Sequence, residues 1–209
     1  MLEVSPLPRL FAIVPAAGHS RRMGRPKLLL PLGATTVIAR MLGVLRRPEI
    51  VETIVVIRPD DEPLRAAVAA CGATTLQPTT APPEMRQSVE HALQAIERKF
   101  DPAPDDGWLL APADHPLLDS AALDPVISAW TAATRKIVVP VHEGRRGHPT
   151  IFPFALAKEV FSLPADQGLN RLLQVYAADV LSVAVASAAV VTDLDTPEDY
   201  ERLRDRRTS

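Results

Sequence analysis

A short segment near the N-terminus, residues 15–27, combines glycine with basic side chains. Its glycines, Gly18 and Gly24, can let backbone N–H groups approach an anion closely. Its four cations fall within seven residues and are Arg21, Arg22, Arg25 and Lys27. At an effective dielectric near 20, a cation close to a phosphate contributes roughly 4 kcal/mol, against about 1 kcal/mol in water. The segment indicates a site for the triphosphate of an NTP, although a solvated basic turn would explain the same residues.

Two familiar phosphate-binding motifs do not match this segment. Five residues separate Gly18 from Gly24, and Arg25 follows. A P-loop requires four residues between its glycines, followed by Lys and then Ser or Thr, and the dinucleotide motif requires G-x-G-x-x-G. P-loop NTPases and nicotinamide dehydrogenases are therefore disfavoured.

A first candidate carboxylate, Asp114, closes the apolar segment that begins at Trp108. An Asp at the end of a buried strand is well placed for Mg²⁺, which prefers carboxylate, water and phosphate oxygens. Asp is also a common turn residue, so Asp114 could instead cap the turn before Pro116. The sequence leaves both interpretations open at this position.

A second acidic site lies near the C-terminus, at Asp193 and Asp195. The residues after it read as the start of a helix, with Thr196 as N-cap, Pro197 as first helical residue and Asp199 in a capping box. Side chains alternate along an extended segment, so the two aspartates are expected to share one face. Two carboxylates on one face are costly unless a cation lies between them.

The segment Ala16–Pro31, AAGHSRRMGRPKLLLP, resembles the signature loop of the MobA-like NTP transferases, and within them the molybdenum cofactor cytidylyltransferases. Pro15 stands where that family usually has Leu. The resemblance implies that the loop, Gly24 included, binds the nucleotide: Ala16, Ala17 and Gly18 line it, and Arg22 and Lys27 hold its phosphates. Arg21 and Arg25 are expected in solvent. The Ala-Ala-Gly triplet implies CTP over GTP.

The same resemblance extends to four further positions. It implies Mg²⁺ binding by Asp114 and by Asp195, with Asp193 as the alternative second ligand. It places His148, in Gly-His-Pro, and Asp166 near the acceptor. His115 replaces the family's usual Gln.

Arg86 and Ser88 lie at the start of a helix where family members read the base. They could hold the nucleotide or cap the helix. Both interpretations stay open.

The elements expected to position these residues alternate along the chain. Apolar runs rich in branched residues predict strands at Leu10–Val14, Ile54–Ile57, Trp108–Ala111, Ile137–Val141 and Val180–Val185, with a weaker strand at Thr150–Phe152. Helical spacing of apolar residues predicts helices around residues 89–100 and 123–130. This alternation predicts an α/β fold, a Rossmann-like, mostly parallel sheet with helices on both faces. The resemblance implies the glycosyltransferase-A or nucleotidyltransferase type.

The strand after the Gly144–Gly147 turn is expected to run antiparallel. Ligands of such sheets bind beyond the carboxyl ends of the strands. We expect the chemistry at the ends of the Leu10, Trp108 and Val180 strands.

Length and composition narrow the classes of protein to which the chain can belong. The 209 residues predict a single domain over 1–209, with a core at about 10–204. A net charge of -2 gives no basic field for nucleic acid, and no apolar run approaches the roughly 20 residues that span a bilayer. The single cysteine, Cys71, excludes a disulfide within the chain and fits a cytoplasmic location.

The resemblance thus implies a Mg²⁺-dependent nucleotidyltransferase that moves CMP from CTP onto molybdopterin cofactor and releases pyrophosphate. Two alternatives stay open: guanylyl transfer or transfer to a sugar or polyol phosphate, and a non-catalytic nucleotide-binding chaperone of a molybdoenzyme. A molybdoenzyme or chaperone is a further expected partner.

Overall fold

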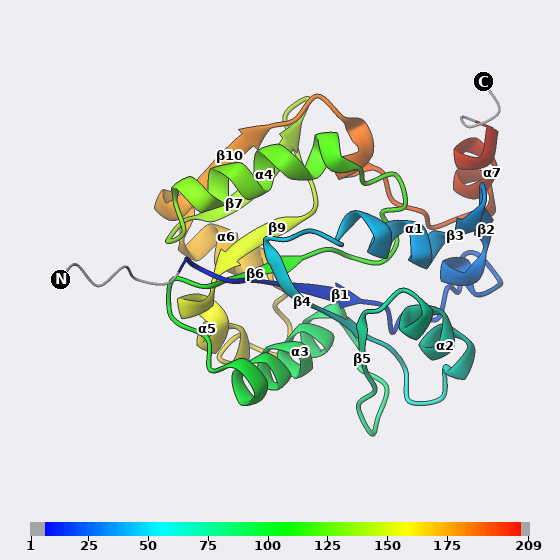
Figure 1. The fold of residues 1–209 in the computed structure, drawn as a ribbon, viewed down its shortest axis with the longest axis horizontal. Helices are drawn as coiled ribbons and strands as arrows, with labels where there is room; N and C mark the ends of the chain where they lie inside the picture. The colour runs from blue at the N-terminus through cyan, green and yellow to red at the C-terminus, as the bar shows by residue number, and fades with distance from the viewer. Residues whose placement is uncertain (1–6, 206–209) are drawn as a thin grey trace.

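One mixed β-sheet forms the centre of the computed structural model, which describes residues 7–205 (Figure 1). Its strands, in spatial order, are β10 (Val180–Ala184), β7 (Ile137–His142), β9 (Thr150–Pro153), β6 (Gly107–Leu110), β1 (Leu10–Pro15), β4 (Ile50–Val56) and β5 (Thr74–Leu76). The short β8 (Arg145–Arg146) pairs with β7, and β2 (Pro31–Leu32) pairs with β3 (Thr35–Thr36) in a separate hairpin. The single-domain prediction includes residues 1–6 and 206–209, which lie outside the described residues.

Strand directions confirm the predicted mostly parallel sheet. β1 pairs in parallel with β4 and with β6, and β10 pairs in parallel with β7. β9 runs antiparallel to both β6 and β7, as expected for the segment after the Gly144–Gly147 turn. All six predicted strands are present, with ends shifted by a few residues, whereas β5 and the β2–β3 hairpin were not predicted.

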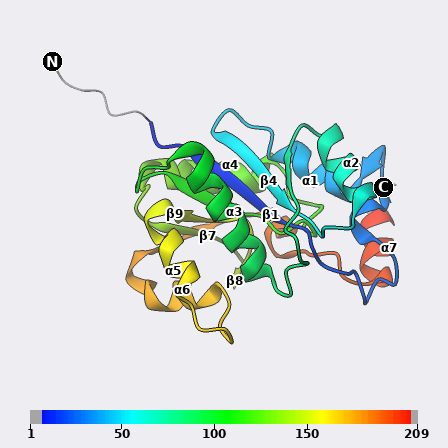
Figure 2. The ribbon, with the colours of Figure 1, turned by 90° about the horizontal axis from the view of Figure 1, so that it is seen from below.

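Helices cover both faces of the sheet, as predicted (Figure 2). Side chains of β1 alternate between the faces, with Leu10, Ala12 and Val14 on one and Phe11 and Ile13 on the other. The first face is covered by α1 (Val37–Val44), α2 (Glu62–Ala70), α4 (Ser120–Ala132) and α7 (Pro197–Asp205). The second face is covered by α3 (Met85–Phe100), α5 (Ala157–Phe161) and α6 (Asn170–Val175).

In the part of the chain that the structure describes, four 3₁₀ helices complete the elements: η1 (Lys27–Leu29), η2 (Phe154–Leu156), η3 (Ala177–Asp179) and η4 (Ala188–Val191). None of the helices in the described range is both long and apolar enough to cross a membrane.

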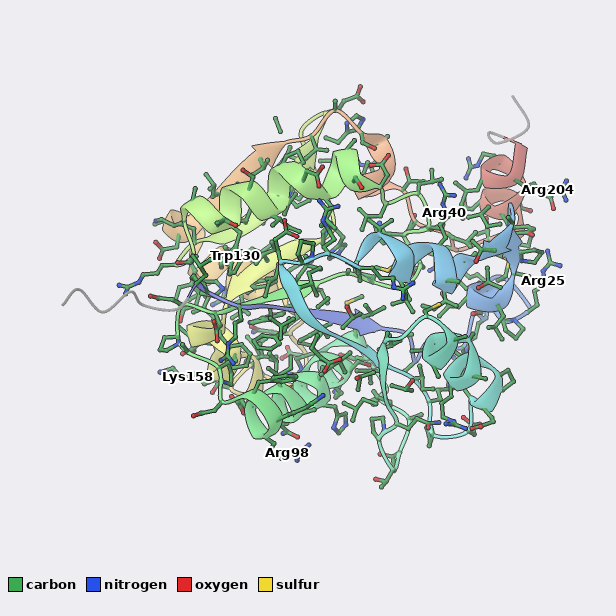
Figure 3. The ribbon with its side chains drawn as sticks, viewed as in Figure 1. Arg25, Arg40, Arg98, Trp130, Lys158 and Arg204 are labelled. Carbon is green, nitrogen blue, oxygen red and sulfur yellow. The ribbon has the colours of Figure 1, made fainter. Side chains whose placement is uncertain are left out.

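Trp130 belongs to the core, as its place on the apolar stripe of α4 suggests (Figure 3). Its side chain is buried against Gly107, where an added Cβ would lie 2.7 Å from the indole ring. The absence of a side chain at Gly107 therefore lets α4 approach the start of β6 closely.

The predicted capping box starts α7. The Thr196 hydroxyl accepts from the Asp199 N–H at 3.2 Å, and the Asp199 carboxylate accepts from the Thr196 N–H at 2.8 Å. Burial raises the pKa of Asp199, but the N–H groups of Thr196 and Asp195, the Thr196 hydroxyl and Arg202 outweigh it and lower the pKa to about 2. The Asp195 N–H also donates to Asp199, at 3.1 Å, so this cap fixes the backbone of a candidate site residue.

Gly147 is packed against the backbone of η4. A Cβ at this position would lie 2.1 Å from the Val190 carbonyl oxygen, and the next residue, His148, donates its N–H to the same oxygen at 2.8 Å. The backbone of Val190 cannot retreat without breaking that hydrogen bond. The close approach therefore requires glycine.

We expect Gly147→Ala to lower the free energy of unfolding by about 3 kcal/mol, because the added methyl group overpacks a fixed backbone. Urea unfolding at pH 7 measures the change. Gly43→Ala in α1 is the matched control, since a Cβ there meets nothing within 4 Å, and it should be neutral or stabilising by up to about 1 kcal/mol. Equal stabilities of the two variants would contradict the packing at Val190.

Candidate active site

The loop after β1 folds into a compact turn. The Gly24 N–H donates to the carbonyl oxygens of Ser20 and Arg21, at 3.0 and 3.3 Å, and Gly24 has φ +70°. This differs from the expected use of its N–H group for an anion, because the group is already engaged within the loop. At Gly18, by contrast, a Cβ would meet nothing within 4 Å, so the space above this residue is open to a ligand.

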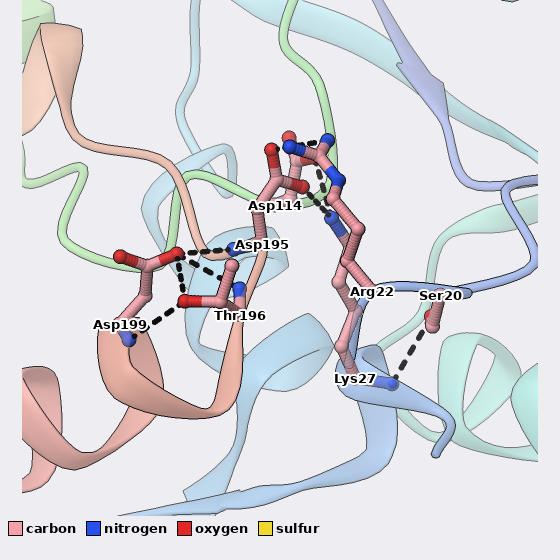
Figure 4. Close-up of polar contacts among 7 residues, drawn as sticks. All are labelled: Ser20, Arg22, Lys27, Asp114, Asp195, Thr196 and Asp199. Carbon is pink, nitrogen blue, oxygen red and sulfur yellow. Dashed lines mark hydrogen bonds and ion pairs between the residues drawn. The ribbon is translucent and has the colours of Figure 1, made fainter. Parts of the chain in front are cut away.

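Lys27 joins two aspartates that are far apart in the sequence (Figure 4). Its Nζ lies 2.8 Å from Asp114 Oδ2 and 2.8 Å from Asp195 Oδ1. Arg22 Nη2 lies 2.7 Å from the second oxygen of Asp195. We call Arg22, Lys27, Asp114 and Asp195 the ion cluster.

The charges within the ion cluster stabilise one another. Burial lowers the pKa of Lys27, but the charges and hydrogen bonds of Asp114 and Asp195 outweigh it and raise the pKa above 10.5. Burial likewise raises the pKa of Asp195, but the hydrogen bond from Lys27 and the charges of Lys27 and Arg22 lower it below 3.8. At neutral pH, Lys27 is therefore positive and Asp195 is negative.

Backbone hydrogen bonds bring the two acidic segments together. β1 and β6 are parallel neighbours, so their carboxyl ends meet, and the Ala113 N–H donates to Pro15 O at 3.3 Å. The Leu194 N–H donates to Asp114 O at 2.8 Å, and the Leu194 side chain is fully buried. Asp195 is thus held beside Asp114 by its neighbour in the chain.

The candidate residues lie just beyond the carboxyl ends of β1 and β6, two of the three strands named, and only indirectly beyond that of β10. β10 is the edge strand of the sheet, beyond β7 and β9. The chain passes through η4 before it reaches Asp195 at the centre. This return path, rather than the end of β10 itself, supplies the second carboxylate.

A pocket of about 610 Å³ opens beside the ion cluster, a size typical of small-molecule sites. Four segments line it: the loop after β1, residues 81–85 with Ser88 at the start of α3, residues 112–114 after β6, and Asp195. Among the predicted site residues, those that line it are Ala16, Ala17, Gly18, Arg22, Lys27, Ser88, Asp114 and Asp195. Gly24 instead lines a neighbouring cavity of about 320 Å³, between the same loop and α2.

Arg86 is placed differently from the sequence expectation. It is buried, and its Nη1 donates to the carbonyl oxygens of Leu163 and Pro164 at 2.7 and 2.8 Å. It is not among the residues that line the pocket, whereas Ser88, two residues later, is. The guanidinium, for which nucleotide binding and helix capping were both left open, is engaged by a distant loop.

His148 lies near Asp114 of the ion cluster and is partly buried. Its ring packs edge-on against His115, with the ring centroids 5.3 Å apart. Burial and the neighbouring His115 lower the pKa of His148 to about 4, against the opposing effect of Asp114. The imidazole is therefore neutral at physiological pH, and His115, whose role the sequence left open, is its buried partner.

Asp166 and Asp193 are both exposed, and neither lines the pocket. Asp166 lies in the connection between α5 and α6. Asp193 lies two residues before Asp195, outside the ion cluster. The geometry therefore favours Asp195 over Asp193 as a partner of Asp114.

Arg58 is a site residue that the sequence analysis missed. It follows β4, and its Nη1 donates to the Gly18 carbonyl oxygen at 3.1 Å while its other terminal nitrogen pairs with Asp61. Arg58 therefore fixes the loop from the strand next to β1. The rule that ligands bind beyond strand ends could have found it, had it been applied to β4 as well.

The donor set of the ion cluster fits a hard divalent cation. Asp114 and Asp195 both hold one ammonium, so their oxygens converge on a shared positive charge. Within residues 7–205, no group of three or more His, Cys, Asp or Glu side chains is placed to hold a metal ion. Mg²⁺ commonly uses one or two carboxylates and completes its shell with water and substrate phosphates, so a pair suffices.

Comparisons with known proteins show which family the chain resembles. The family model described as MobA-like NTP transferase domain matches residues 12–183. The chain is similar to the purine catabolism protein PucB of Bacillus subtilis (strain 168), with 29% identity over 211 residues that cover 94% of this chain and 97% of PucB. It is also similar to the molybdenum cofactor cytidylyltransferase of Escherichia coli (strain K12), with 23% identity over 197 residues that cover 94% and 96%.

A solved structure extends the comparison to a metal. The crystal structure of Rv0371C of Mycobacterium tuberculosis H37Rv in complex with manganese has a TM-score of 0.73 and 28% identity to this chain. The match covers 94% of this chain and 98% of that chain.

We expect Lys27→Met to raise the pKa of Asp195 and to lower the free energy of unfolding by about 1–2 kcal/mol at pH 7. The reason is that two neighbouring carboxylates lose their shared cation in a partly exposed site. Carboxyl-detected NMR titration and urea unfolding measure the two effects. The destabilisation should shrink as the pH falls through the carboxyl pKa values, because protonation removes the repulsion.

Arg21→Met is the matched control for this prediction. It removes a cation from the same loop, but Arg21 is exposed and has no ion pair within the described residues. If it shifted the pKa of Asp195 as much as Lys27→Met does, the pairing in the ion cluster would be wrong.

Proposed function

Since the chain belongs to the family of MobA-like NTP transferase domains, we propose that it transfers CMP from CTP onto the phosphate of a molybdopterin-type acceptor. Pyrophosphate is the second product. The observation that carries this proposal is the ion cluster: two acidic segments and a basic loop converge at the mouth of a pocket large enough for a nucleotide.

The basic residues lie on one part of the pocket lining, and this supports one orientation of the bound NTP. The loop after β1 contributes Arg21, Arg22 and Lys27 to one part of the lining, and residues 81–85 with Ser88 form another wall. The triphosphate belongs beside the cations, and Ala16, Ala17 and the open space above Gly18 leave room for the nucleoside. The base then lies toward Ser88, a small polar residue in that wall.

Two observations support CTP as the donor. The Ala16-Ala17-Gly18 triplet resembles the cytidylyl-transferring branch of the family, and one similar protein is a cytidylyltransferase of molybdenum cofactor. The molybdopterin-type acceptor is proposed on the same resemblance. His148, which is neutral and partly buried near Asp114, and Asp166 are proposed for the acceptor side.

The proposed reaction is a displacement at the α-phosphorus. An acceptor phosphate oxygen forms a bond to this atom while the bond to the oxygen that bridges the α- and β-phosphates breaks, and that oxygen leaves with pyrophosphate. The attacking oxygen is ionised at neutral pH, so no side chain has to remove a proton. Catalysis is therefore alignment and charge neutralisation.

The chain's own residues supply most of that neutralisation. Arg22 and Lys27 pair with phosphate oxygens of the donor. They either leave their carboxylate partners or contact carboxylate and phosphate at the same time. Asp114 and Asp195 would hold Mg²⁺, which when bound neutralises charge on the α-phosphate. Arg58 keeps the loop backbone in place through the Gly18 carbonyl.

We expect Asp114→Ala to reduce pyrophosphate release by at least about 10²–10³-fold, the effect of losing a preorganised electrostatic contact. The fold should persist, because Asp114 is a partly exposed side chain at a strand end. Asp195→Asn should show a similar loss and Asp193→Asn should not, since Asp193 lies outside the ion cluster. Near-wild-type turnover by Asp114→Ala would refute the metal assignment.

A panel of donors and acceptors tests the substrates. Pyrophosphate release should require CTP, molybdopterin and Mg²⁺ together, with CTP preferred over GTP by at least about tenfold, which corresponds to roughly 1.4 kcal/mol. Pyrophosphate release with GTP in place of CTP would show that the proposed donor is wrong. Release with a sugar or polyol phosphate in place of molybdopterin would show that the proposed acceptor is wrong. Binding of CTP without release, for every acceptor, would instead favour a non-catalytic chaperone.

A further inference from the structure

Arg86 is a buried cation that the proposed chemistry does not use. It is 8% exposed, although it stands in the first turn of α3, between pocket-lining residues. Its Nε lies 3.3 Å from Glu90 Oε1, one helical turn later, so its charge is balanced within the helix. Burying a guanidinium is costly unless its donors are used, so its remaining partners define its role.

Those remaining partners are two consecutive carbonyl groups in the connection between α5 and α6. Arg86 Nη1 donates to Leu163 O at 2.7 Å and to Pro164 O at 2.8 Å. Pro164 O also accepts the Gln167 N–H at 3.0 Å, which closes a four-residue turn over Pro164–Gln167. Arg86 therefore holds the first residue of this turn.

Asp166 is the third residue of that turn. It is exposed and lies outside the pocket-lining set, and its side chain makes no hydrogen bond or ion pair within residues 7–205. Its position therefore depends on the backbone of the turn. Leu169, at the other end of the connection, is anchored in the core with α3.

The same turn of α3 faces the pocket on its other side. Met85 and Ser88 line the pocket, and α5 packs beside α3 (Figure 2). One helical turn therefore presents two residues to the nucleotide pocket and a third, Arg86, to the Pro164–Gln167 turn.

We propose that Arg86 is a positioning residue. It holds the Pro164–Gln167 turn, and with it Asp166, against α3, whose first turn lines the nucleotide pocket. This inference rests on the proposed function insofar as Asp166 serves the acceptor. Arginine suits the task because one guanidinium donates hydrogen bonds to two carbonyls while it forms an ion pair with a carboxylate. Without it, the two carbonyls lose their donor and the turn opens more often.

Arg86→Met tests the proposal with two readouts. Amide hydrogen exchange in the peptide that covers residues 163–168 should accelerate by about tenfold, the effect expected from losing these hydrogen bonds. The KM for molybdopterin should rise by a similar factor, because the apparent affinity for the acceptor falls with the fraction of molecules in which the Pro164–Gln167 turn is closed. CTP affinity, measured by calorimetry with Mg²⁺, should change by less than about threefold.

Two further variants complete the design. Arg86→Lys should restore part of the exchange protection, since its ammonium can still reach a carbonyl. Arg98→Met is the matched control on the same helix: Arg98 is exposed, without an ion pair in the described range, and should leave both readouts unchanged. Thermal unfolding of each variant verifies that the fold persists. If Arg86→Met does not fold, Arg86→Lys carries the test, with intermediate acceleration expected.

Two results would overturn the proposal. One is unchanged exchange at residues 163–168 with CTP affinity reduced tenfold or more, which would mean that Arg86 contributes to nucleotide binding instead. The other is faster exchange with an unchanged KM for the acceptor, which would leave a purely structural role. The exchange readout does not require turnover, so failure of the proposed activity stays distinguishable from failure of this inference.

Discussion

The structure of the site depends on placing two carboxylates side by side without leaving them unpaired. Two like charges about 4 Å apart repel by roughly 4 kcal/mol at an effective dielectric near 20, which few loops could withstand. Lys27 removes this repulsion by lying 2.8 Å from both Asp114 and Asp195. The ion cluster is therefore stable by itself, and its carboxylates are already oriented toward one positive charge.

The fold meets this requirement with backbone contacts rather than with long side chains. Parallel pairing of β1 and β6 brings the basic loop next to Asp114, and the Leu194 N–H ties the returning chain to the same residue. Gly147 allows η4, which comes shortly before Asp195 in the chain, to lie close against the segment between β8 and β9 that carries His148. The capping box of α7 then fixes Asp195 from the other side. Apart from the hydrogen bond to the Asp199 carboxylate, these contacts join main chain to main chain, so they tolerate little change.

Local patterns in the sequence predicted those parts that depend on local physics. Buried strands such as β1 and β7 are runs of branched apolar residues, and the Thr196 box is a short-range motif, so both were found. β5 and the β2–β3 hairpin were not, because two or three residues carry too little periodicity. Arg86 and the Gly24 N–H were misplaced for another reason. A cation or an amide near a helix or loop can serve a ligand or the protein itself, and the choice is made by partners such as Leu163, distant in the chain.

The two cations of the ion cluster differ in solvent exposure, and this gives them different roles in the proposed function. The Arg22 side chain is 72% exposed, so its pair with Asp195 contributes little, and it can turn to an arriving phosphate at small cost. Lys27 is 13% exposed and is held by two carboxylates, so moving it requires a replacement positive charge between them. Mg²⁺ held by Asp114 and Asp195 would supply that charge. Release of Lys27 toward the phosphates of the donor would then be linked to metal binding, and the basic loop would become fully available only with nucleotide and metal together.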